Sequence, residues 1–389
     1  YLITVSHMIN DSCQSVLPAL LPLFIYTYGL SLEQAGFLIL ANTALSSLLQ
    51  PLLGYLSDKI NQPRLIALGV LLSACSTGVM GFVTSYESLL VCATLAGVGS
   101  SIFHPEGAKI MNRLGGGKKG KAMGTFAIGG SSGFAIGPLF AGSIAYTVGP
   151  HGLAAFTVVG LIISTILFIL MPRIVAHART IDQAVAIENP TLVDKPLKNY
   201  WKYFGILFVI ILSQSVNFRV INAFIPIFWT RELGTSPEQG SFALTIFFSI
   251  GIFMTYIGGL LGDKYGPIKI IRLSLLIWLP AMFLLTEVPT FSPVIMMPIA
   301  YMLLLMIGAA KALSYSPVIV LGQTYLAKSI GFASGITLGV SQTIGGIIAP
   351  VVGNLADTYS LPAAMMTLVP FLVVGLGASL ILKDPKKLQ

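Results

Sequence analysis

The sequence predicts an all-α membrane protein in which twelve transmembrane helices form two pseudo-symmetric bundles of six. Three observations predict this fold class. Only 9% of the 389 residues are charged and 55% are hydrophobic, with a mean hydropathy of +0.87, whereas about 25% of the residues in a soluble protein are charged. Apolar runs long enough to cross a bilayer fill most of the chain. A short charged motif occurs twice, and its aspartates, Asp58 and Asp263, lie 205 positions apart, which indicates an internal repeat.

The apolar runs give the individual elements in order. The twelve predicted spans are residues 2–28, 33–57, 65–84, 88–111, 122–148, 152–171, 203–229, 238–262, 268–286, 293–317, 331–356 and 361–382. We expect the first run to be a span and not a signal peptide, because it is long and contains Asn10 and Asp11. The polar segment 172–201 is predicted to be a linker between a bundle over 1–171 and a bundle over 202–389.

The net charge of +8 is explained by orientation. With twelve spans, nearly all Lys and Arg residues fall on one side of the membrane; Arg231 lies in an opposite loop, and Arg219 and Lys311 lie inside spans. Because basic loops stay in the cytoplasm, we expect both termini there and no nucleic-acid partner. The three cysteines lie within spans and lack metal-ligand spacing, so no metal site or disulfide framework is expected.

Further matched positions support the duplication. Asp11 corresponds to Arg219, His104-Pro105 to Ser316-Pro317, and Gly137-Pro138 to Ala349-Pro350, at offsets of 208 to 212 positions. Two six-helix halves with this parallel symmetry are typical of transporters built from repeats.

The charged motif carries a resemblance to a known family. Its first copy consists of Gly54, Asp58, Lys59 and Arg64, and its second of Gly259, Asp263, Lys264 and Lys269. Both resemble the loop signature of the major facilitator superfamily, although Asn61 and Gln62-Pro63 depart from it in the first copy and Pro267-Ile268 in the second. The resemblance implies a gating network at the cytoplasmic closure.

A second motif lies in the fifth predicted span. Gly124, Gly133, Gly137, Pro138 and Gly142 resemble the antiporter motif of that superfamily, with Ala141 at one glycine position. Small residues at such steps let a neighbouring helix approach closely, and Pro138 removes a backbone donor. The resemblance implies exporter geometry; the alternative is a generic packing seam.

A narrower resemblance covers the first four spans. The blocks Ser6-His7-Met8-Ile9-Asn10-Asp11 and 99–106, which reads GSSIFHPE, resemble the fosmidomycin-resistance branch of drug exporters. This resemblance implies proton-driven efflux of small polar, anionic compounds across a bacterial inner membrane by a protein that we expect to be a monomer.

Ionisable residues inside the spans are few and concentrated. They are His7, Asp11, His104, Glu106, Arg219 and Lys311, on spans one, four, seven and ten only. Each costs at least about 2.5–3.5 kcal/mol at mid-membrane unless it has a partner or a watery cavity. We therefore expect these four spans to line a common cavity.

Span one is predicted to provide the proton-coupling group. His7, Asp11 and Gln14 share one face, and the repeat symmetry would place Asp11 opposite Arg219. Solute binding to Arg219 would then release Asp11 to accept a proton; the alternative is a structural ion pair. His104 and Glu106 are further proton-coupling candidates. The alternative for His104 is capping of carbonyls at the Pro105 break, and for Glu106 it is a cytoplasmic gate.

The second half is predicted to bind the solute. Arg219 and Asn222 share a face of span seven, and Lys311 and Tyr315 lie one turn apart on span ten. With Gln14 from the first half, they form the predicted substrate-binding set. A wall with two cations suits an anionic or zwitterionic solute.

The sequence offers no catalytic or nucleotide-binding constellation. Residues 115–121 read as G-x-x-x-x-G-K, but Ala122 replaces the Ser or Thr of a P-loop and a predicted membrane helix precedes them. We expect no nucleotide, cofactor or metal and no enzyme activity. The prediction is a proton-coupled antiporter that exports a small polar or anionic compound, such as a phosphonate drug or a metabolite of the opine-type metallophore class. The alternative is an importer or facilitator of a small anionic metabolite with the same fold.

Overall fold

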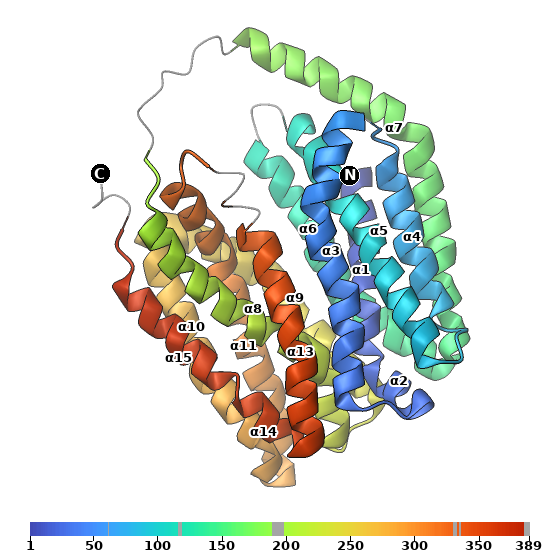
Figure 1. Ribbon diagram of the computed structural model, residues 1–389, viewed down its shortest axis with the longest axis vertical. Helices are drawn as coiled ribbons and strands as arrows, with labels where there is room; N and C mark the ends of the chain where they lie inside the picture. The colour runs from blue at the N-terminus through green and yellow to red at the C-terminus, as the bar shows by residue number, and fades with distance from the viewer. Residues whose placement is uncertain (61, 116–118, 189–197, 330–332, 334–335, 385–389) are drawn as a thin grey trace. The chain divides into compact units, whose positions relative to one another are not determined.

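The computed structural model is helical along most of the chain (Figure 1). It describes residues 1–60, 62–115, 119–188, 198–329, 333 and 336–384. Within these residues, the pairing of extended backbone is limited to one isolated bridge between Asn199 and Leu326. The predicted all-α class is therefore confirmed.

The chain divides into two compact units. The first comprises residues 1–17 and 41–196, and the second comprises residues 18–40 and 197–389. The boundary near residue 197 falls inside the predicted linker, whereas residues 18–40 group with the C-terminal half of the chain. The predicted bundle boundaries at 171 and 202 stay a prediction.

The first unit is built from long helices. These are α1 (Leu2–Ala19), most of α3 (Leu32–Ile60), α4 (Leu65–Val79), α5 (Tyr86–Leu114), α6 (Lys119–Thr147), the short η2 (Pro150–Leu153) and α7 (Ala154–Glu188). A cluster of buried apolar side chains from α1, α4, α5, α6 and α7, which includes Ile3, Val70 and Phe103, forms a core.

The second unit also consists of helices. These are α2 (Leu21–Tyr28), α8 (Trp201–Arg231), α9 (Pro237–Tyr265), α10 (Pro267–Glu287), η3 (Val288–Thr290), α11 (Pro293–Tyr325), the π-helical η4 (Ile336–Val340), α13 (Ser341–Thr358), α14 (Leu361–Met366) and α15 (Val369–Ile381).

Every predicted span contains helix, but the helices differ in length and continuity. Among the described residues, eight helical segments are long and apolar enough to cross a membrane, or nine if α1 and α2 count as one bent span. The 47° bend between α1 and α2 follows Pro18, because proline removes a backbone donor and disrupts the helix.

Helix α6 packs tightly against α1 through small residues. A β-carbon at Gly133 would overlap the carbonyl of Met8, and one at Gly137 would overlap the hydroxyl of Ser15. Gly124, by contrast, faces open space. Part of the predicted glycine motif thus forms a close helix–helix contact, which fixes α1 against α6 at the depth of the polar residues.

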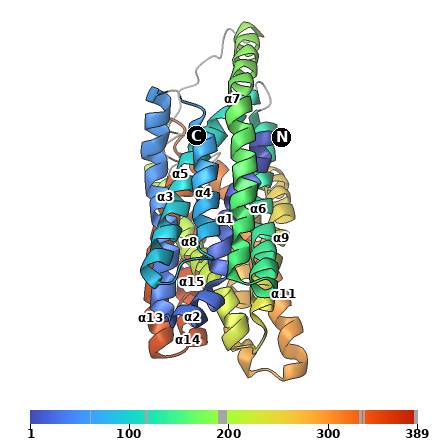
Figure 2. The same cartoon turned by 90° about the vertical axis from the view of Figure 1, so that its right-hand side faces the viewer.

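Helix α7 extends past the predicted span 152–171 (Figure 2). It continues to Glu188 with Pro172 in its interior, and Figure 1 shows the helix bending along its length. Proline in a helix interior is a usual cause of such a kink. Residues 172–188 of the predicted linker are therefore helical.

Candidate functional site

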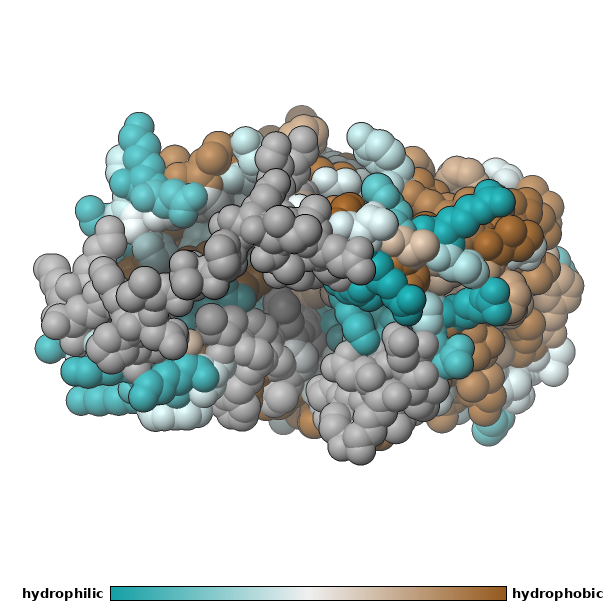
Figure 3. Space-filling view, turned by 90° about the horizontal axis from the view of Figure 1, so that it is seen from above, coloured by the Kyte–Doolittle hydropathy of each residue, from teal (hydrophilic) through white to brown (hydrophobic). Residues whose placement is uncertain are grey.

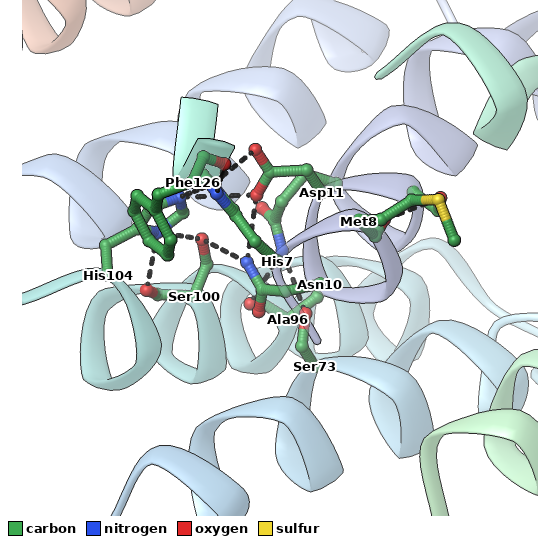
Figure 4. A network of polar contacts seen from close by, with 11 residues as sticks. His7, Met8, Asn10, Asp11, Ser73, Ala96, Ser100, His104 and Phe126 are labelled. Carbon is green, nitrogen blue, oxygen red and sulfur yellow. Dashed lines mark hydrogen bonds and ion pairs between the residues drawn. The ribbon is translucent and has the colours of Figure 1, made fainter. Parts of the chain in front are cut away.

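Three titratable side chains meet inside the first unit. His7 and Asp11 lie one turn apart on α1, and His104 comes from α5 (Figure 4). His7 Nε2 lies 3.1 Å from Asp11 Oδ2, His104 Nε2 lies 3.2 Å from Asp11 Oδ1, and the two Nε2 atoms are 3.3 Å apart. The sequence placed all three among the proton-coupling candidates, and the structure brings them together.

The backbone fixes the tautomer of both histidines. His7 Nδ1 lies 2.7 Å from the carbonyl oxygen of Phe126, and His104 Nδ1 lies 2.9 Å from the carbonyl oxygen of Ser100. A carbonyl oxygen only accepts, so each Nδ1 must carry the hydrogen and donate. In the neutral form of either ring, Nε2 then presents a lone pair to the carboxylate of Asp11. The expectation that His104 caps a carbonyl near Pro105 is therefore compatible with its contact to Asp11.

In this His–Asp–His cluster, three hydrogen-bond acceptors face one another. Two imidazole lone pairs and a carboxylate converge within hydrogen-bond distance, and none of the three groups donates to another unless a proton is added. One added proton would convert a repulsive contact into a charge-assisted hydrogen bond. His7 and Asp11 are buried, whereas 27% of the His104 side chain is exposed, so His104 is the member that solvent reaches most easily.

Polar neighbours hold the carboxylate in place. The side-chain amide of Asn10 donates to Asp11 Oδ1 at 3.0 Å and to the hydroxyl of Ser100 at 3.3 Å. Asn10 is fully buried. It thereby links α1 to α5 at the same point where His104 reaches Asp11 (Figure 4).

Helix α6 closes the other side of the cluster. The ring of Phe126 stacks on His7 with centroids 3.9 Å apart. One turn further on, a β-carbon at Gly130 would lie 2.7 Å from Asp11 Oδ2 and from His7 Nε2. The absence of a side chain at Gly130 therefore makes room for the His–Asp–His cluster.

The same three side chains offer ligand atoms to a metal ion. Their ligating atoms all lie within 4.8 Å of one another, and they form such a group among the described residues. The sequence led us to expect no metal, and that expectation stays untested.

Two other candidates from the first unit lie apart from this cluster. Gln14, predicted to bind substrate, donates to the hydroxyl of Ser73 at 3.0 Å and to the carbonyl of Ala96 at 2.9 Å, so it ties α1 to α4 and α5. Glu106 is buried on α5, two residues after His104. Residues two positions apart lie on different faces of a helix, so the side chain of Glu106 lies on another face than that of His104.

In the second unit, two cations share one aromatic ring. The guanidinium carbon of Arg219 lies 5.7 Å from the centroid of the Phe218 ring, and Lys311 Nζ lies 4.7 Å from the same centroid. Lys311 Nζ also lies 4.7 Å from the centroid of the Tyr315 ring. Helices α8 and α11 thus bring three of the predicted substrate-binding residues together.

Two buried hydrogen-bond donors lie on α8. Among the described residues, neither Arg219 Nε nor Gln214 Nε2 has a hydrogen-bond acceptor, although Gln214 Oε1 accepts from Ser314 at 3.2 Å. A small hollow of about 40 Å³ is lined by Gln214, Lys311 and Tyr315. A buried donor without an acceptor costs free energy. The basic wall formed by Gln214, Arg219, Lys311 and Tyr315 is therefore suited to a solute that supplies acceptor oxygens.

The remaining substrate-binding candidate lies on the same helix as Arg219. Asn222 is 3% exposed, and its Oδ1 has no donor within the described part of the chain. Asn222 lies three residues after Arg219 on α8, so the two share a face of this helix.

The charged motifs lie at helix ends. In the second copy, Gly259 contacts α11 near Ser316, and Asp263 and Lys264 are exposed at the end of α9. Gly266 follows with φ of 94°, a left-handed value that favours glycine, and Lys269 is exposed on α10. In the first copy, Gly54, Asp58 and Lys59 lie on α3, but their side chains are outside the described set; Arg64 is exposed. The gating role stays a prediction.

The antiporter motif follows α6 through the first unit. Gly133, Gly137, Pro138 and Gly142 are buried, while Gly124 is exposed. Its role in transport also stays a prediction.

Sequence reasoning missed four contributors to the cluster: Asn10, Ser100, Phe126 and Gly130. Asn10 and Ser100 occur in the two blocks that carry the narrower resemblance, so that signal was present. Nothing in the sequence marks the carbonyl of Phe126 as an acceptor. The predicted partner of Asp11 was Arg219, whereas the described residues pair Asp11 with His7 and His104 inside one unit; the Asp11–Arg219 contact stays a prediction.

Comparison with known proteins places this geometry in a family. The model of the Major Facilitator Superfamily matches residues 3–350 and 204–389. The chain is 30% identical to an uncharacterized MFS-type transporter, YfnC of Bacillus subtilis, over 99% of this chain and 93% of the relative. It is 29% identical to the fosmidomycin resistance protein of Escherichia coli, over 92% and 86% of the two chains.

A solved structure supports the same fold. A bacterial homologue of the human lysosomal transporter Spinster superposes with a TM-score of 0.76 at 17% identity, and the match covers 98% of this chain and 95% of that one. The family consists of transporters and not of enzymes. The predicted fold is thereby confirmed, and the chain belongs to the major facilitator superfamily.

Proposed function

We propose that the protein is a proton-coupled antiporter that exports a small anionic or zwitterionic compound by alternating access. The observation that carries the proposal is the His–Asp–His cluster, in which both Nδ1 atoms are committed to carbonyls and both Nε2 atoms face Asp11. A proton added to either Nε2 atom would replace lone-pair repulsion by a charge-assisted hydrogen bond to the carboxylate of Asp11.

The groups that face the carboxylate define the proton site. They are His7 from α1 and His104 from α5, with the uncharged Asn10, Phe126 and Gly130 completing the surroundings. Histidine is the side chain whose ordinary titration falls nearest neutral pH. We expect the proton to be shared between Asp11 and the two Nε2 atoms, with His104 exchanging it with solvent. Glu106, buried one half-turn away, is a second carrier.

The solute would bind at the donor-rich wall. Arg219, Lys311 and Gln214 all present N–H groups, and the Phe218 and Tyr315 rings shield the cations. Arg219 Nε and Gln214 Nε2 have no acceptor among the described residues, and a carboxylate or phosphonate group would supply acceptor oxygens. The name of the Escherichia coli relative makes fosmidomycin the first compound to test.

Antiport requires the proton and the solute to be carried in turn. Charge inside the membrane is expensive: a proton neutralises Asp11 in the His–Asp–His cluster, an anion compensates Arg219 and Lys311, and exchange follows if solute binding displaces the proton. Binding the proton from outside and the solute from inside, in turn, gives antiport. The two charged motifs would close the cytoplasmic side of the transporter. Gly133 and Gly137 of α6, which contact α1, would keep these two helices together during the conformational change. We place both termini in the cytoplasm of a bacterial cell and expect a monomer.

Transport in oriented membranes tests this proposal. Inside-out vesicles with an acidic interior are expected to accumulate fosmidomycin, and a protonophore is expected to abolish accumulation. The Asp11→Asn variant should bind the compound but fail to accumulate it. Accumulation that persists after the gradient collapses would rule out proton coupling.

The same experiment addresses the alternative of an importer or facilitator. An importer accumulates solute in right-side-out vesicles, and a facilitator only equilibrates it. Either result would replace the export assignment while leaving the family unchanged.

A further inference from the structure

A second basic hollow lies at one end of the first unit, and none of its lining residues belongs to the His–Asp–His cluster. It has a volume of about 290 Å³ and is lined by residues 62–64, just before α4, and by Pro172, Val175, Ala176 and Arg179 of α7. Its two charged lining residues, Arg64 and Arg179, are exposed. Figure 3 looks onto this end of the molecule and shows hydrophilic residues gathered there, with hydrophobic residues along the flanks.

One of the two arginines is held in place by an aromatic ring. The guanidinium carbon of Arg64 lies 4.8 Å from the centroid of the Phe168 ring. Such stacking orients the guanidinium and leaves its N–H fork available. Among the described residues, neither Arg64 nor Arg179 forms an ion pair with an acid. Two guanidinium groups therefore flank the hollow, and none of the described acids forms an ion pair with either of them.

The residues of α7 that line the hollow continue an exposed apolar stripe on the same helix. Ile162, Ile166 and Ile169 are 54%, 38% and 65% exposed, and they follow one another at helical steps of four and three. The next steps of three and four reach Pro172, Val175 or Ala176, and Arg179, which line the hollow. One face of α7 thus runs from apolar surface directly into the basic hollow.

We propose that this hollow binds the phosphate head group of an anionic phospholipid, whose acyl chains lie along the stripe of Ile162, Ile166 and Ile169. Arginine forks match phosphate oxygens in bidentate geometry, and basic pockets at the cytoplasmic side of membrane helices suit anionic lipid head groups. A free phosphate shares the head-group chemistry, but it would leave the adjoining apolar stripe unused. The site goes beyond the proposed transport function, since neither the proton nor the solute enters it.

A phosphate bound in this hollow would also contact the first charged motif. Arg64 belongs to that motif and precedes α4, while Arg179 lies on α7. A phosphate bridging the two would hold the beginning of α4 against α7. The lipid composition of the membrane would then influence how readily the beginning of α4 moves against α7.

Lipid binding to the purified full-length protein tests the site. Delipidated protein in detergent is titrated with phosphatidylglycerol, with phosphatidylcholine of the same acyl chains, and with inorganic phosphate, and bound lipid is counted by native mass spectrometry. The Arg64→Gln/Arg179→Gln double variant is compared with Arg173→Gln, an exposed arginine on the same helix that does not line the hollow. We expect the double variant to lose about tenfold or more in phosphatidylglycerol affinity and Arg173→Gln to stay within about twofold.

The other outcomes separate the possible sources of phosphate. Three results would each overturn the proposal. The first is that phosphatidylcholine binds as tightly as phosphatidylglycerol, and the second is that the double and control variants lose the same affinity for phosphatidylglycerol. The third is that inorganic phosphate at matched concentration displaces the lipid. If the double variant does not fold, Arg64→Lys/Arg179→Lys keeps the charges but removes the forks. An intermediate loss is expected for that variant, and unchanged affinity would contradict bidentate binding. Because the readout is lipid mass, it is independent of whether transport is proton-coupled.

Discussion

Gly130 is expected to control the geometry of the His–Asp–His cluster. In Gly130→Ala the new β-carbon would lie 2.7 Å from Asp11 Oδ2 and from His7 Nε2, which is about 0.7 Å closer than the 3.4 Å at which ordinary contact begins. If Asp11 moves by that amount away from His7, their 3.1 Å contact lengthens to about 3.8 Å, beyond hydrogen-bond range. Loss of one charge-assisted hydrogen bond corresponds to about 1.5–3 kcal/mol, so gradient-driven transport should fall at least about tenfold.

The assay is gradient-driven uptake of fosmidomycin into inside-out vesicles, with solute binding measured separately on purified protein. Gly124→Ala is the matched control on the same helix, since a β-carbon there meets no atom within 4 Å, and it should transport as the unmodified protein does. Gly133→Ala instead meets the main chain of Met8 and should lower thermal stability. Full transport by Gly130→Ala at normal expression would refute the reasoning.

The remaining predictions concern single side chains. Asp11→Asn removes the titratable carboxylate, so proton-driven export should vanish while solute binding survives; driven export at the normal rate would exclude Asp11 as carrier. Arg219→Ala and Lys311→Ala each remove a donor from the basic wall, and each should weaken binding of an anionic solute about tenfold or more in equilibrium binding to purified protein. Unchanged affinity in both variants would refute the basic wall. Arg272→Gln deletes hydrogen bonds of 2.9 and 2.8 Å to the carbonyl oxygen of Ser379 near the end of α15. The Tm in detergent should therefore fall while transport activity is retained. An unaltered Tm would show that these two hydrogen bonds do not stabilise the protein.

The sequence predicted the fold class because the membrane imposes strong constraints on composition. Backbone groups inside lipid must pair within a helix, so an apolar run of sufficient length has few alternatives. The same constraint identified Asp11, His104 and Arg219 as unusual, since charged residues rarely enter spans without a function. These arguments use only residue type and spacing, which the sequence states directly.

The contacts within the sites could not be predicted in the same way. Repeat symmetry suggested Arg219 as the partner of Asp11, yet the closest charged partner depends on side-chain direction and on where α5 crosses α1. His104 reaches Asp11 because Asn10 and Ser100 hold the two helices together. The acceptor of His7 is a main-chain carbonyl at Phe126, and backbone acceptors carry no signature in a sequence. Gln14 was a candidate for solute binding, but its amide is used between helices.

Helix boundaries show a similar limit. Proline at position 172 ends the apolar run of the sixth span, so the linker was expected to begin there. The helix instead bends and continues to Glu188, because a helix that is anchored on one side of a proline can resume beyond it. That continuation is what creates the hollow lined by Arg179.

Proton release on solute binding tests the central claim most directly. Purified protein in weakly buffered solution is mixed with fosmidomycin, and the change in pH is followed with an indicator dye. Because an antiported solute must displace the proton, the unmodified protein should release protons when the solute binds, and Asp11→Asn should bind the solute without release. Lys264→Gln, at the exposed end of α9, should release protons normally. Proton uptake on binding would instead favour coupling through Arg219, in which the solute frees Asp11 to accept a proton. Undiminished release from Asp11→Asn would contradict the assignment of the His–Asp–His cluster as the proton site.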